Sequence, residues 1–289
     1  MIENLISYES ATGKKLAMRE FLPEGKRRPR AGMVVIHGIG DYIKRYTEVV
    51  EVLTGEGIAV IGIDLPGHGE SEGKRGDVGR LTDVHTVIDE ARGVLREIVE
   101  PVGGKIGALA HSAGGMLLFE YLTRYPGNFA FAWVNACLID PLHRRSGKTA
   151  PLARIANVVA PSMTISTKVV PAMGKAGEPE QHPPLEEGKG HDRVSVRFGL
   201  ELTRAQKRIE KFHRNLNRDF RLLMTHGGAD EVCPIGYARE FYSKLEIGKK
   251  EFREFPQHLH HLLHDPAVLE LGVDWLRRAL QPARIVRRG

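Results

Sequence analysis

Ser112 stands between a short apolar run and a helical pattern, a setting that can make a serine hydroxyl reactive. Residues 105–110 predict a buried strand, and the spacing of apolar residues over 116–124 predicts a helix. Only a sharp turn fits between them, and the small residues Ala113 and Gly114 suit a close approach of strand and helix. This turn lifts the hydroxyl above the sheet and directs backbone N–H groups at the oxyanion that forms when it attacks a carbonyl. We therefore interpret Ser112 as a candidate nucleophile.

A second serine, Ser71, fits the glycine-serine-glycine motif of such a turn better than Ser112 does. Before Ser112, Ala110 occupies the position of the first glycine of the motif. However, Glu70 and Glu72 flank Ser71 and their charges would oppose an oxyanion. No apolar helix follows this serine either. The context therefore favours Ser112.

A serine hydroxyl is a weak nucleophile until a histidine removes its proton and a carboxylate orients that histidine. When the serine follows a strand of a doubly wound sheet, the acid and then the histidine come later in the chain. Asp230 lies between an expected strand at 221–224 and an expected helix at 235–245, so it is the candidate acid. An aspartate in such a place can also be a plain loop or helix-capping residue.

The candidate base lies in the segment 256–266, which carries four histidines. The local sequence alone leaves the choice open among His258, His260 and His261. The fourth histidine of the segment is His264. Their spacing also permits a metal cluster. No second group of Cys, Asp or Glu residues at metal-ligand spacing accompanies them, so we expect neither a metal ion nor an organic cofactor.

The elements that must position these residues alternate between strands and helices. This order predicts an α/β fold with a mostly parallel, doubly wound sheet, whose sites lie beyond the carboxyl ends of the strands. The expected strands are two within 5–21 and others at 33–36, 58–63, 106–110, 129–139, 221–224 and 251–255; the expected helices are 41–55, 83–99, 116–124, 235–245 and one containing 268–276.

The alternation stops between Asp140 and Arg218, where prolines cluster. Residues 152–159 and 198–209 in this region predict short amphipathic helices. We interpret residues 140–218 as an inserted, mostly helical cap over the carboxyl ends of the strands. The core domain is then formed by residues 1–139 and 219–289.

Composition narrows the cellular setting of the protein. Of 289 residues, 42% are hydrophobic and 27% are charged, which suits a globular core, and no apolar run reaches the length of a membrane span. The N-terminus lacks the pattern of a signal peptide, and two cysteines give no disulfide framework, so we expect a cytoplasmic location.

The net charge of +6 includes basic runs at 26–30 and 284–288. These runs lack interleaved aromatics and a nucleic-acid module, so we expect no nucleic-acid partner; transient contact with a membrane surface remains compatible with them.

Four sequence blocks occur in an order and spelling typical of one family. They are His37-Gly38-Ile39-Gly40-Asp41 with Arg45-Tyr46, Asp64 with 67–73, 111–115, and His226-Gly227 with Asp230. The chain thereby resembles the monoacylglycerol lipase and lysophospholipase group of serine hydrolases with the α/β-hydrolase fold. In that group the block around Ser71 is a structural loop. The resemblance covers nearly the whole core and is weak over 140–218.

The resemblance also implies which histidine acts and where the oxyanion binds. When the last sequence block of the group is aligned with residues 256–266, its catalytic histidine falls on His260. The backbone N–H groups of Ile39 and Ala113 form the oxyanion hole. The departures from the group are Ala110 for glycine, Asp41 for glutamate, Gln257 for glycine and His261 for glutamate, and none removes a reacting group.

The implied activity is hydrolysis of a small single-chain lipid ester through a Ser112-His260-Asp230 triad and an acyl-enzyme. Rival interpretations within the same fold are a short-chain carboxylesterase, a peptidase or a thioesterase, because a fold does not fix a function. A protein of this fold that binds a ligand without catalysis is a rival from another class.

Overall fold

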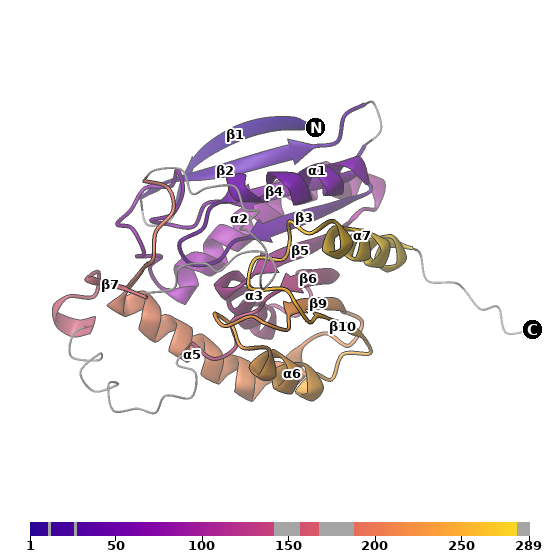
Figure 1. Ribbon diagram of the computed structural model, residues 1–289. Coiled ribbons are helices and arrows are strands. Elements are labelled where there is room, and N and C mark those ends of the chain that lie inside the picture. Colours follow the sequence, from indigo (N-terminus) through magenta and orange to yellow (C-terminus); the bar gives the residue numbers. More distant parts are fainter. Residues whose placement is uncertain (11–12, 26–27, 142–156, 168–187, 282–289) are drawn as a thin grey trace, which may run out of the picture.

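A computed structural model describes residues 1–10, 13–25, 28–141, 157–167 and 188–281 of the chain (Figure 1). An eight-stranded sheet runs through these residues in the order β1-β2-β4-β3-β5-β6-β9-β10. Its strands are β1 (Ile2–Glu9), β2 (Lys15–Leu22), β3 (Ala31–Ile36), β4 (Ile58–Ile63), β5 (Lys105–His111), β6 (Phe131–Asn135), β9 (Arg221–Gly227) and β10 (Lys249–Phe255). A separate antiparallel pair consists of β7 (Thr164–Ser166) and β8 (Arg193–Ser195).

The six strands from β4 to β10 in the sheet run parallel, whereas β1 and β2 form an antiparallel hairpin added at one edge. The expected mostly parallel, doubly wound sheet is therefore confirmed. Parallel strands end at one edge of the sheet, so the loops that follow β5, β9 and β10 open on the same side. The expected strand at 129–139 is shorter than predicted, because Ala136 adopts a φ of 44° and ends β6.

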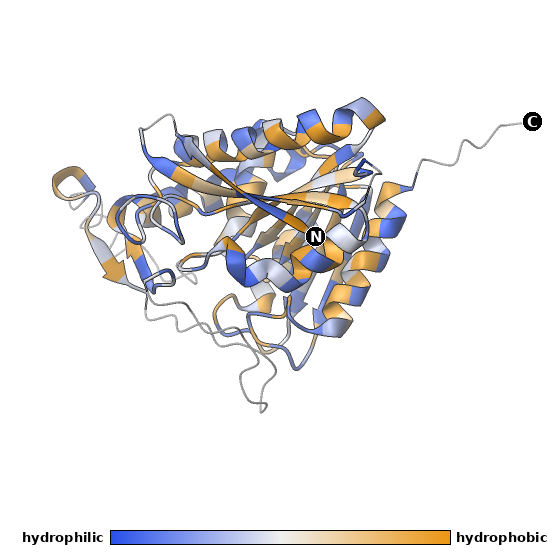
Figure 2. Ribbon diagram, turned by 90° about the horizontal axis from the view of Figure 1, so that it is seen from above, coloured by the Kyte–Doolittle hydropathy of each residue, from blue (hydrophilic) through white to orange (hydrophobic). Residues whose placement is uncertain are grey.

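Helices cover both faces of the sheet (Figure 1). α1 (Thr47–Gly55) and α7 (Pro266–Leu280) lie on one face; α2 (Leu81–Val99), α3 (Ala113–Arg124), α5 (Val196–Phe212) and α6 (Ile235–Lys244) lie on the other. Alternate residues of one strand enter the two layers, since Val34 of β3 packs with α2 and α3 while Met33 packs with α1 and α7. Both residues are completely buried, and the apolar strands lie between helices whose outer faces are hydrophilic (Figure 2).

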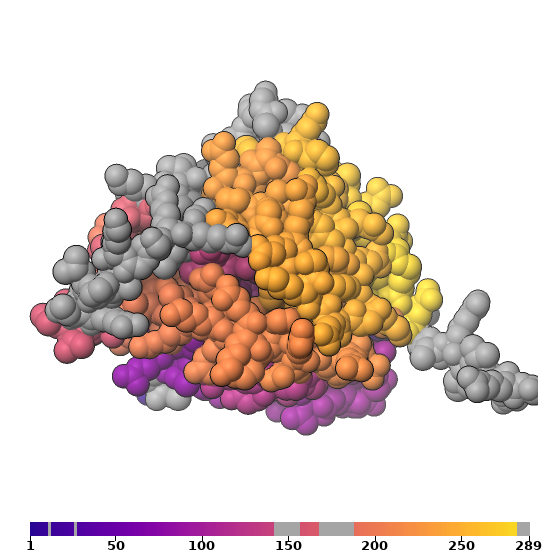
Figure 3. Space-filling view, turned by 90° about the horizontal axis from the view of Figure 1, so that it is seen from below, coloured from indigo at the N-terminus to yellow at the C-terminus, as the bar shows by residue number. Residues whose placement is uncertain are grey.

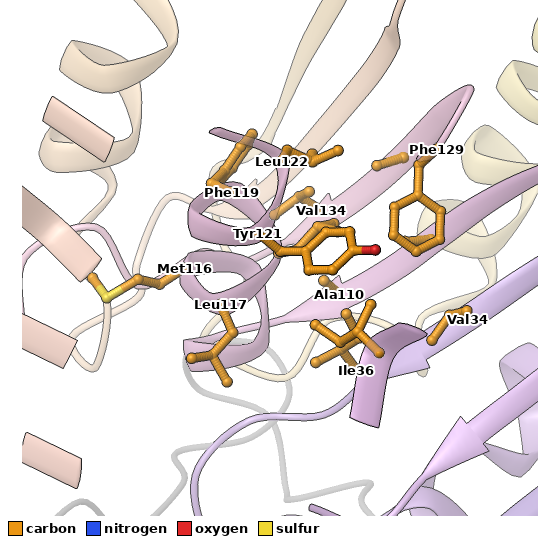
Figure 4. Packing of buried hydrophobic residues seen from close by; sticks show 14 of the residues in the cluster. Val34, Ile36, Ala110, Met116, Leu117, Phe119, Tyr121, Leu122, Phe129 and Val134 are labelled. Atoms are coloured by element: carbon orange, nitrogen blue, oxygen red, sulfur yellow. The ribbon is translucent and has the colours of Figure 1, made fainter. Parts of the chain in front are cut away.

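α3 packs directly on the centre of the sheet, as Figure 4 shows for Leu117 and Tyr121 over Ile36 and Ala110. The packing is close enough that a Cβ at Gly114 would lie 2.3 Å from the carbonyl oxygen of Ile36. A side chain at this position would therefore push the helix away from β3. This contact fixes the first turn of α3, and with it the turn that carries Ser112.

The region interpreted as a cap is described only in part. Most of the predicted helix at 152–159 lies outside the described residues, whereas the predicted helix at 198–209 is α5. Phe198, Leu202 and Ile209 of α5 are buried in the same apolar cluster as α3. Seen from below, α5 and α6 share one face of the molecule (Figure 3). The division into a core and a cap at 140–218 stays a prediction.

Candidate active site

Ser112, Asp230 and His260 follow three strands of the parallel part of the sheet. Ser112 follows β5 directly, Asp230 lies three residues beyond β9, and His260 lies in the loop after β10. The order β5-β6-β9-β10 places these ends on one side of the molecule. Residues far apart in sequence are thereby brought together, as the sequence predicted.

Ser112 has the backbone conformation of a sharp turn, with φ of 54° and ψ of −123°. Residues with a side chain rarely adopt a positive φ, and holding one there costs about 1–3 kcal/mol. The turn is held by neighbours on both sides, because the Ser112 N–H donates to Asn135 and its carbonyl accepts from Leu138, both at 3.0 Å. The adjoining strand and helix thus impose a strained turn on Ser112.

A continuous chain of hydrogen bonds joins the three side chains. Ser112 Oγ lies 2.9 Å from His260 Nε2, and His260 Nδ1 lies 2.8 Å from Asp230 Oδ2. Since a carboxylate only accepts, Nδ1 carries the imidazole proton and Nε2 presents its lone pair to the serine hydroxyl. His260 and Asp230 are 3% and 5% exposed, so water competes little for these bonds.

Hydrogen bonds keep the side chain of Asp230 ionised. Burial acts to raise its pKa, but hydrogen bonds from His226 and His260 and from the N–H of Cys233 outweigh burial, and the pKa lies well below its usual value. Its Oδ1 accepts from the N–H groups of Val232 at 2.9 Å and Cys233 at 2.8 Å. These bonds fix the carboxylate, and the carboxylate fixes the orientation of the His260 ring.

The segment after β3 lies against the serine. A Cβ at Gly38 would lie 2.9 Å from the Cβ of Ser112, so only glycine permits this approach. Ile39 follows at once, and among the described residues its backbone N–H meets no acceptor. Ala113 is the first residue of α3, where backbone N–H groups have no acceptor within the helix. Two N–H groups beside one serine hydroxyl can together accept an oxyanion.

Buried polar residues hold this segment in place. Asp41 accepts hydrogen bonds from Arg45 and from the hydroxyl of Tyr46, both at 2.9 Å. Asp64 accepts from the N–H of Ile43 at 2.7 Å and from that of Glu70 at 2.9 Å, which joins this segment to the loop after β4. The first two blocks of the family resemblance therefore supply structural supports for the segment around Ile39.

The other histidines of 256–266 have different surroundings. His258 bonds to Asp265 at 2.9 Å, and His264 bonds to Glu48 at 3.0 Å, so neither is directed at Ser112. His261 lies beside His111, with ring centroids 4.7 Å apart. The geometry places His260 alone of these four against the serine.

Ser71 occupies a supporting position. Its hydroxyl accepts from the N–H of Ala17 at 2.9 Å and donates to the carbonyl of Asp64, and the residue is 5% exposed. This hydroxyl therefore ties the loop after β4 to β2. His37 and His68 likewise bond to backbone groups, through Nδ1 to the carbonyls of Gly38 and Pro66.

Two further side chains, Cys233 and His111, lie beside the serine. Cys233 is buried, and its Sγ lies 3.9 Å from Ser112 Oγ. His111, directly before Ser112, bonds through Nδ1 to Asn135 Oδ1 at 2.9 Å, and its ring centroid lies 4.8 Å from that of His260. Adjacency to Ser112 was the only sequence signal for His111, and nothing local pointed to Asn135.

Two groups of side chains in the described part of the chain could hold a metal ion. One ring nitrogen from each of His111, His260 and His261 lies within 4.8 Å of the others, and so do ligand atoms of Asp230, Cys233 and His260. Both groups include His260. A metal ion in either group would therefore bind a residue of the hydrogen-bonded chain from Ser112 to Asp230.

Two surface depressions lie away from these residues. One of about 320 Å³ is lined by Arg253, Glu270 and Asp274 with their neighbours, and one of about 330 Å³ lies where β9 and β10 begin. Both are rich in charged side chains and lie remote from Ser112. They do not suit the acyl part of a lipid ester.

Comparison with known proteins places the chain in a family. A family model described as "Serine aminopeptidase, S33" matches residues 27–267. The chain belongs to this family. As an S33 member it is a serine hydrolase, and the resemblance to the monoacylglycerol lipase group is confirmed by its relatives.

Relatives of this S33 protein include human monoglyceride lipase, which is 29% identical over 269 residues and covers 88% of this chain and 82% of the relative. Bacillus subtilis phospholipase YtpA is 26% identical over 83% of this chain and 91% of its own length. Among solved structures, Paleococcus ferrophilus monoacylglycerol lipase has a TM-score of 0.77 at 24% identity, covering 91% and 99% of the two chains. The expected α/β-hydrolase fold is confirmed. Over the residues described here, no helix has both the length and the apolar character needed to cross a membrane.

Proposed function

We propose that this S33 protein hydrolyses small single-chain lipid esters, such as monoacylglycerols or lysophospholipids, with Ser112 as nucleophile, His260 as base and Asp230 as orienting acid. The observation that carries the proposal is the chain of hydrogen bonds from Ser112 Oγ through His260 to Asp230. The names of the human and Bacillus subtilis relatives support a lipid ester as substrate.

The geometry supports the following steps. His260 Nε2 accepts the Ser112 proton while Oγ attacks the ester carbonyl, and the imidazolium that forms is stabilised by Asp230. The backbone N–H groups of Ile39 and Ala113 bind the oxyanion of the tetrahedral intermediate. His260 then gives its proton to the leaving alcohol, and water releases the acyl group by the same steps in reverse.

The region 140–218 is proposed to act as a cap that lines the acyl site and meets the lipid surface from which the substrate comes. Val158, Val159 and Ile165 are 82%, 79% and 53% exposed, and Met163 lies in the same short stretch. Several exposed apolar side chains within one short stretch of a folded protein favour an interaction surface. Replacing Val158 and Val159 by serine is expected to reduce sedimentation with phosphatidylcholine vesicles and leave hydrolysis of a dissolved short ester unchanged.

The substrate class is tested by the dependence of kcat/KM on acyl-chain length. Each buried methylene contributes about 0.8 kcal/mol, so kcat/KM is expected to rise from acetyl to at least octanoyl 4-nitrophenyl esters. Monoacylglycerols are expected to exceed triacylglycerols as substrates, and aminoacyl anilides, the test for an aminopeptidase, are expected to remain uncleaved. A preference for acetyl esters with no gain on lengthening would leave a short-chain esterase. Failure of a fluorophosphonate probe to label the protein at Ser112 would leave a non-catalytic binding protein.

A further inference from the structure

His111, at the end of β5, meets His260 and His261 from the loop after β10. Ring centroids of His111 and His260 lie 4.8 Å apart, those of His111 and His261 4.7 Å, and those of His260 and His261 5.2 Å. One ring nitrogen from each histidine lies within 4.8 Å of the others. Imidazole nitrogens in a group of three are typical ligands of Zn²⁺ and related transition-metal ions.

A hydrogen bond fixes the ring of His111 through Nδ1 and leaves Nε2 to be accounted for. Its Nδ1 donates to Asn135 Oδ1 at 2.9 Å, and the amide of Asn135 is held in turn by Thr225 Oγ1 at 2.9 Å. His111 Nε2 therefore carries the lone pair. This atom is buried, and among the described residues it has no hydrogen-bond partner.

His260 has the same arrangement. Its Nδ1 donates to Asp230 Oδ2 at 2.8 Å, and its Nε2 lone pair faces Ser112 Oγ. Metal-bound histidines in proteins almost always donate their second ring N–H to a carboxylate or a carbonyl oxygen. Both histidines thus already have the supporting contacts of metal ligands, with Nε2 ready to bind.

We propose that His111, His260 and His261 form an inhibitory site for Zn²⁺ or a similar borderline transition-metal ion. Zinc lies about 2.0–2.1 Å from each nitrogen in a tetrahedral site, so bound nitrogens lie roughly 3.3 Å apart and these side chains must close together on binding. The ion takes the Nε2 lone pair of His260 away from Ser112, whose hydroxyl keeps its proton. Loss of activity through this site rests on the proposed function, whereas binding of the ion does not.

The second group, Asp230, Cys233 and His260, fits a metal ion less well. Two of its members already bond to each other, because His260 Nδ1 lies 2.8 Å from Asp230 Oδ2. The group also requires the thiolate of Cys233, and burial raises the pKa of that thiol well above its usual value. A metal ion there would break the contact that orients His260, so this group serves as the alternative in the test.

The test measures binding and inhibition separately. In isothermal titration calorimetry of the Ser112→Ala protein, Zn²⁺ is expected to bind at one site. Adding His261→Gln is expected to weaken binding at least about tenfold, because even the loss of a residue that only supports a ligand costs about 10–100-fold. His264→Gln is the matched control, since His264 lies in the same segment but bonds to Glu48. In the active enzyme Zn²⁺ is expected to abolish ester hydrolysis, EDTA to restore it, and His261→Gln to confer resistance.

Three outcomes would overturn the proposal. They are binding that appears only at millimolar Zn²⁺, unchanged affinity in a folded His261→Gln protein, and affinity lost in Cys233→Ala but kept in His261→Gln. Saturating Zn²⁺ without inhibition of an active enzyme would overturn the inhibitory role. If the protein hydrolyses no ester at all, the proposed function fails, and the calorimetry still decides whether the site exists.

Discussion

Ser112 Oγ lies 2.9 Å from His260 Nε2, although the two residues are 148 positions apart. We expect Ser112→Ala to lower kcat/KM for ester hydrolysis by at least about a thousandfold while the circular dichroism spectrum stays unchanged. Ser71→Ala is the matched control and is expected to keep its activity. Because the buried Ser71 hydroxyl joins Ala17 to Asp64, this variant is expected to lose about 1–3 kcal/mol of stability. Near-normal turnover by Ser112→Ala would refute the assignment.

The strained backbone of Ser112 predicts an unusual order of stabilities. Glycine normally destabilises a folded position relative to alanine by about 0.5–1 kcal/mol. At a φ of 54°, however, alanine keeps the strain of about 1–3 kcal/mol and glycine loses it. We therefore expect Ser112→Gly to be more stable than Ser112→Ala by about 1 kcal/mol, a net difference within these opposing ranges. Urea denaturation of the two inactive proteins measures this difference, and the reverse order would show that the strain is smaller than the cost of glycine.

The four histidines of 256–266 are expected to differ sharply in importance. His260→Ala is expected to abolish ester hydrolysis, since it removes the only one of these rings that faces Ser112. His258→Ala and His264→Ala lose contacts with Asp265 and Glu48 and are expected to alter stability more than kcat. His261→Ala is expected to remain active. An inactive but folded His258→Ala protein would show that the base is misassigned.

Cys233 is expected to make the enzyme sensitive to small thiol reagents, because its Sγ lies 3.9 Å from Ser112 Oγ. A methylthio group attached there occupies the space beside the nucleophile. The reaction is expected to be slow, since burial raises the pKa of the thiol well above its usual value and leaves little thiolate. Cys233→Ala is expected to be active and resistant, whereas Cys137→Ala keeps the sensitivity. Equal sensitivity of wild type and Cys233→Ala would exclude this explanation.

Stability is expected to fall as the pH is lowered from about 6.5 toward 4. Burial lowers the pKa of His111 to about 3 and that of His191 to about 4, whereas histidines in the unfolded chain titrate near 6.5. In this window the unfolded chain binds protons that the folded chain does not, so stability is complete above about pH 6.5 and is lost below it. His111 alone contributes a slope of at most about 1.4 kcal/mol per pH unit. Urea denaturation between pH 7 and 5 measures the slope, and His191→Gln is expected to reduce it.

The sequence predicted the parts of the fold and site that depend on local patterns. The apolar strands, the helix after Ser112 and the position of Asp230 after a strand all followed from periodicity and turn chemistry. The choice of His260 required the resemblance to a family, because the local sequence alone does not distinguish His260 from His258 and His261. That choice and the roles of Ile39 and Ala113 stay predictions.

The surroundings of His111 could not be predicted, because they depend on the order of strands in the sheet. Asn135 lies opposite His111 of β5 on one side and Thr225 of β9 on the other, because β6 lies between these two strands. No local pattern encodes this order. The short length of β6 depends in the same way on Ala136, whose N–H bonds to Thr225 across the sheet.

β7 and β8 pair in antiparallel fashion, with Ser166 opposite Arg193. The stretch between these two residues therefore begins and ends at neighbouring positions. These positions form its stem, and the cost of closing such a stretch grows only slowly with its length. A change in the length of this stretch is therefore expected to leave the sheet and the triad unaltered. Because we propose that this region lines the acyl site, chimeras that graft the corresponding stretch of a relative onto this stem are expected to change the ester selectivity.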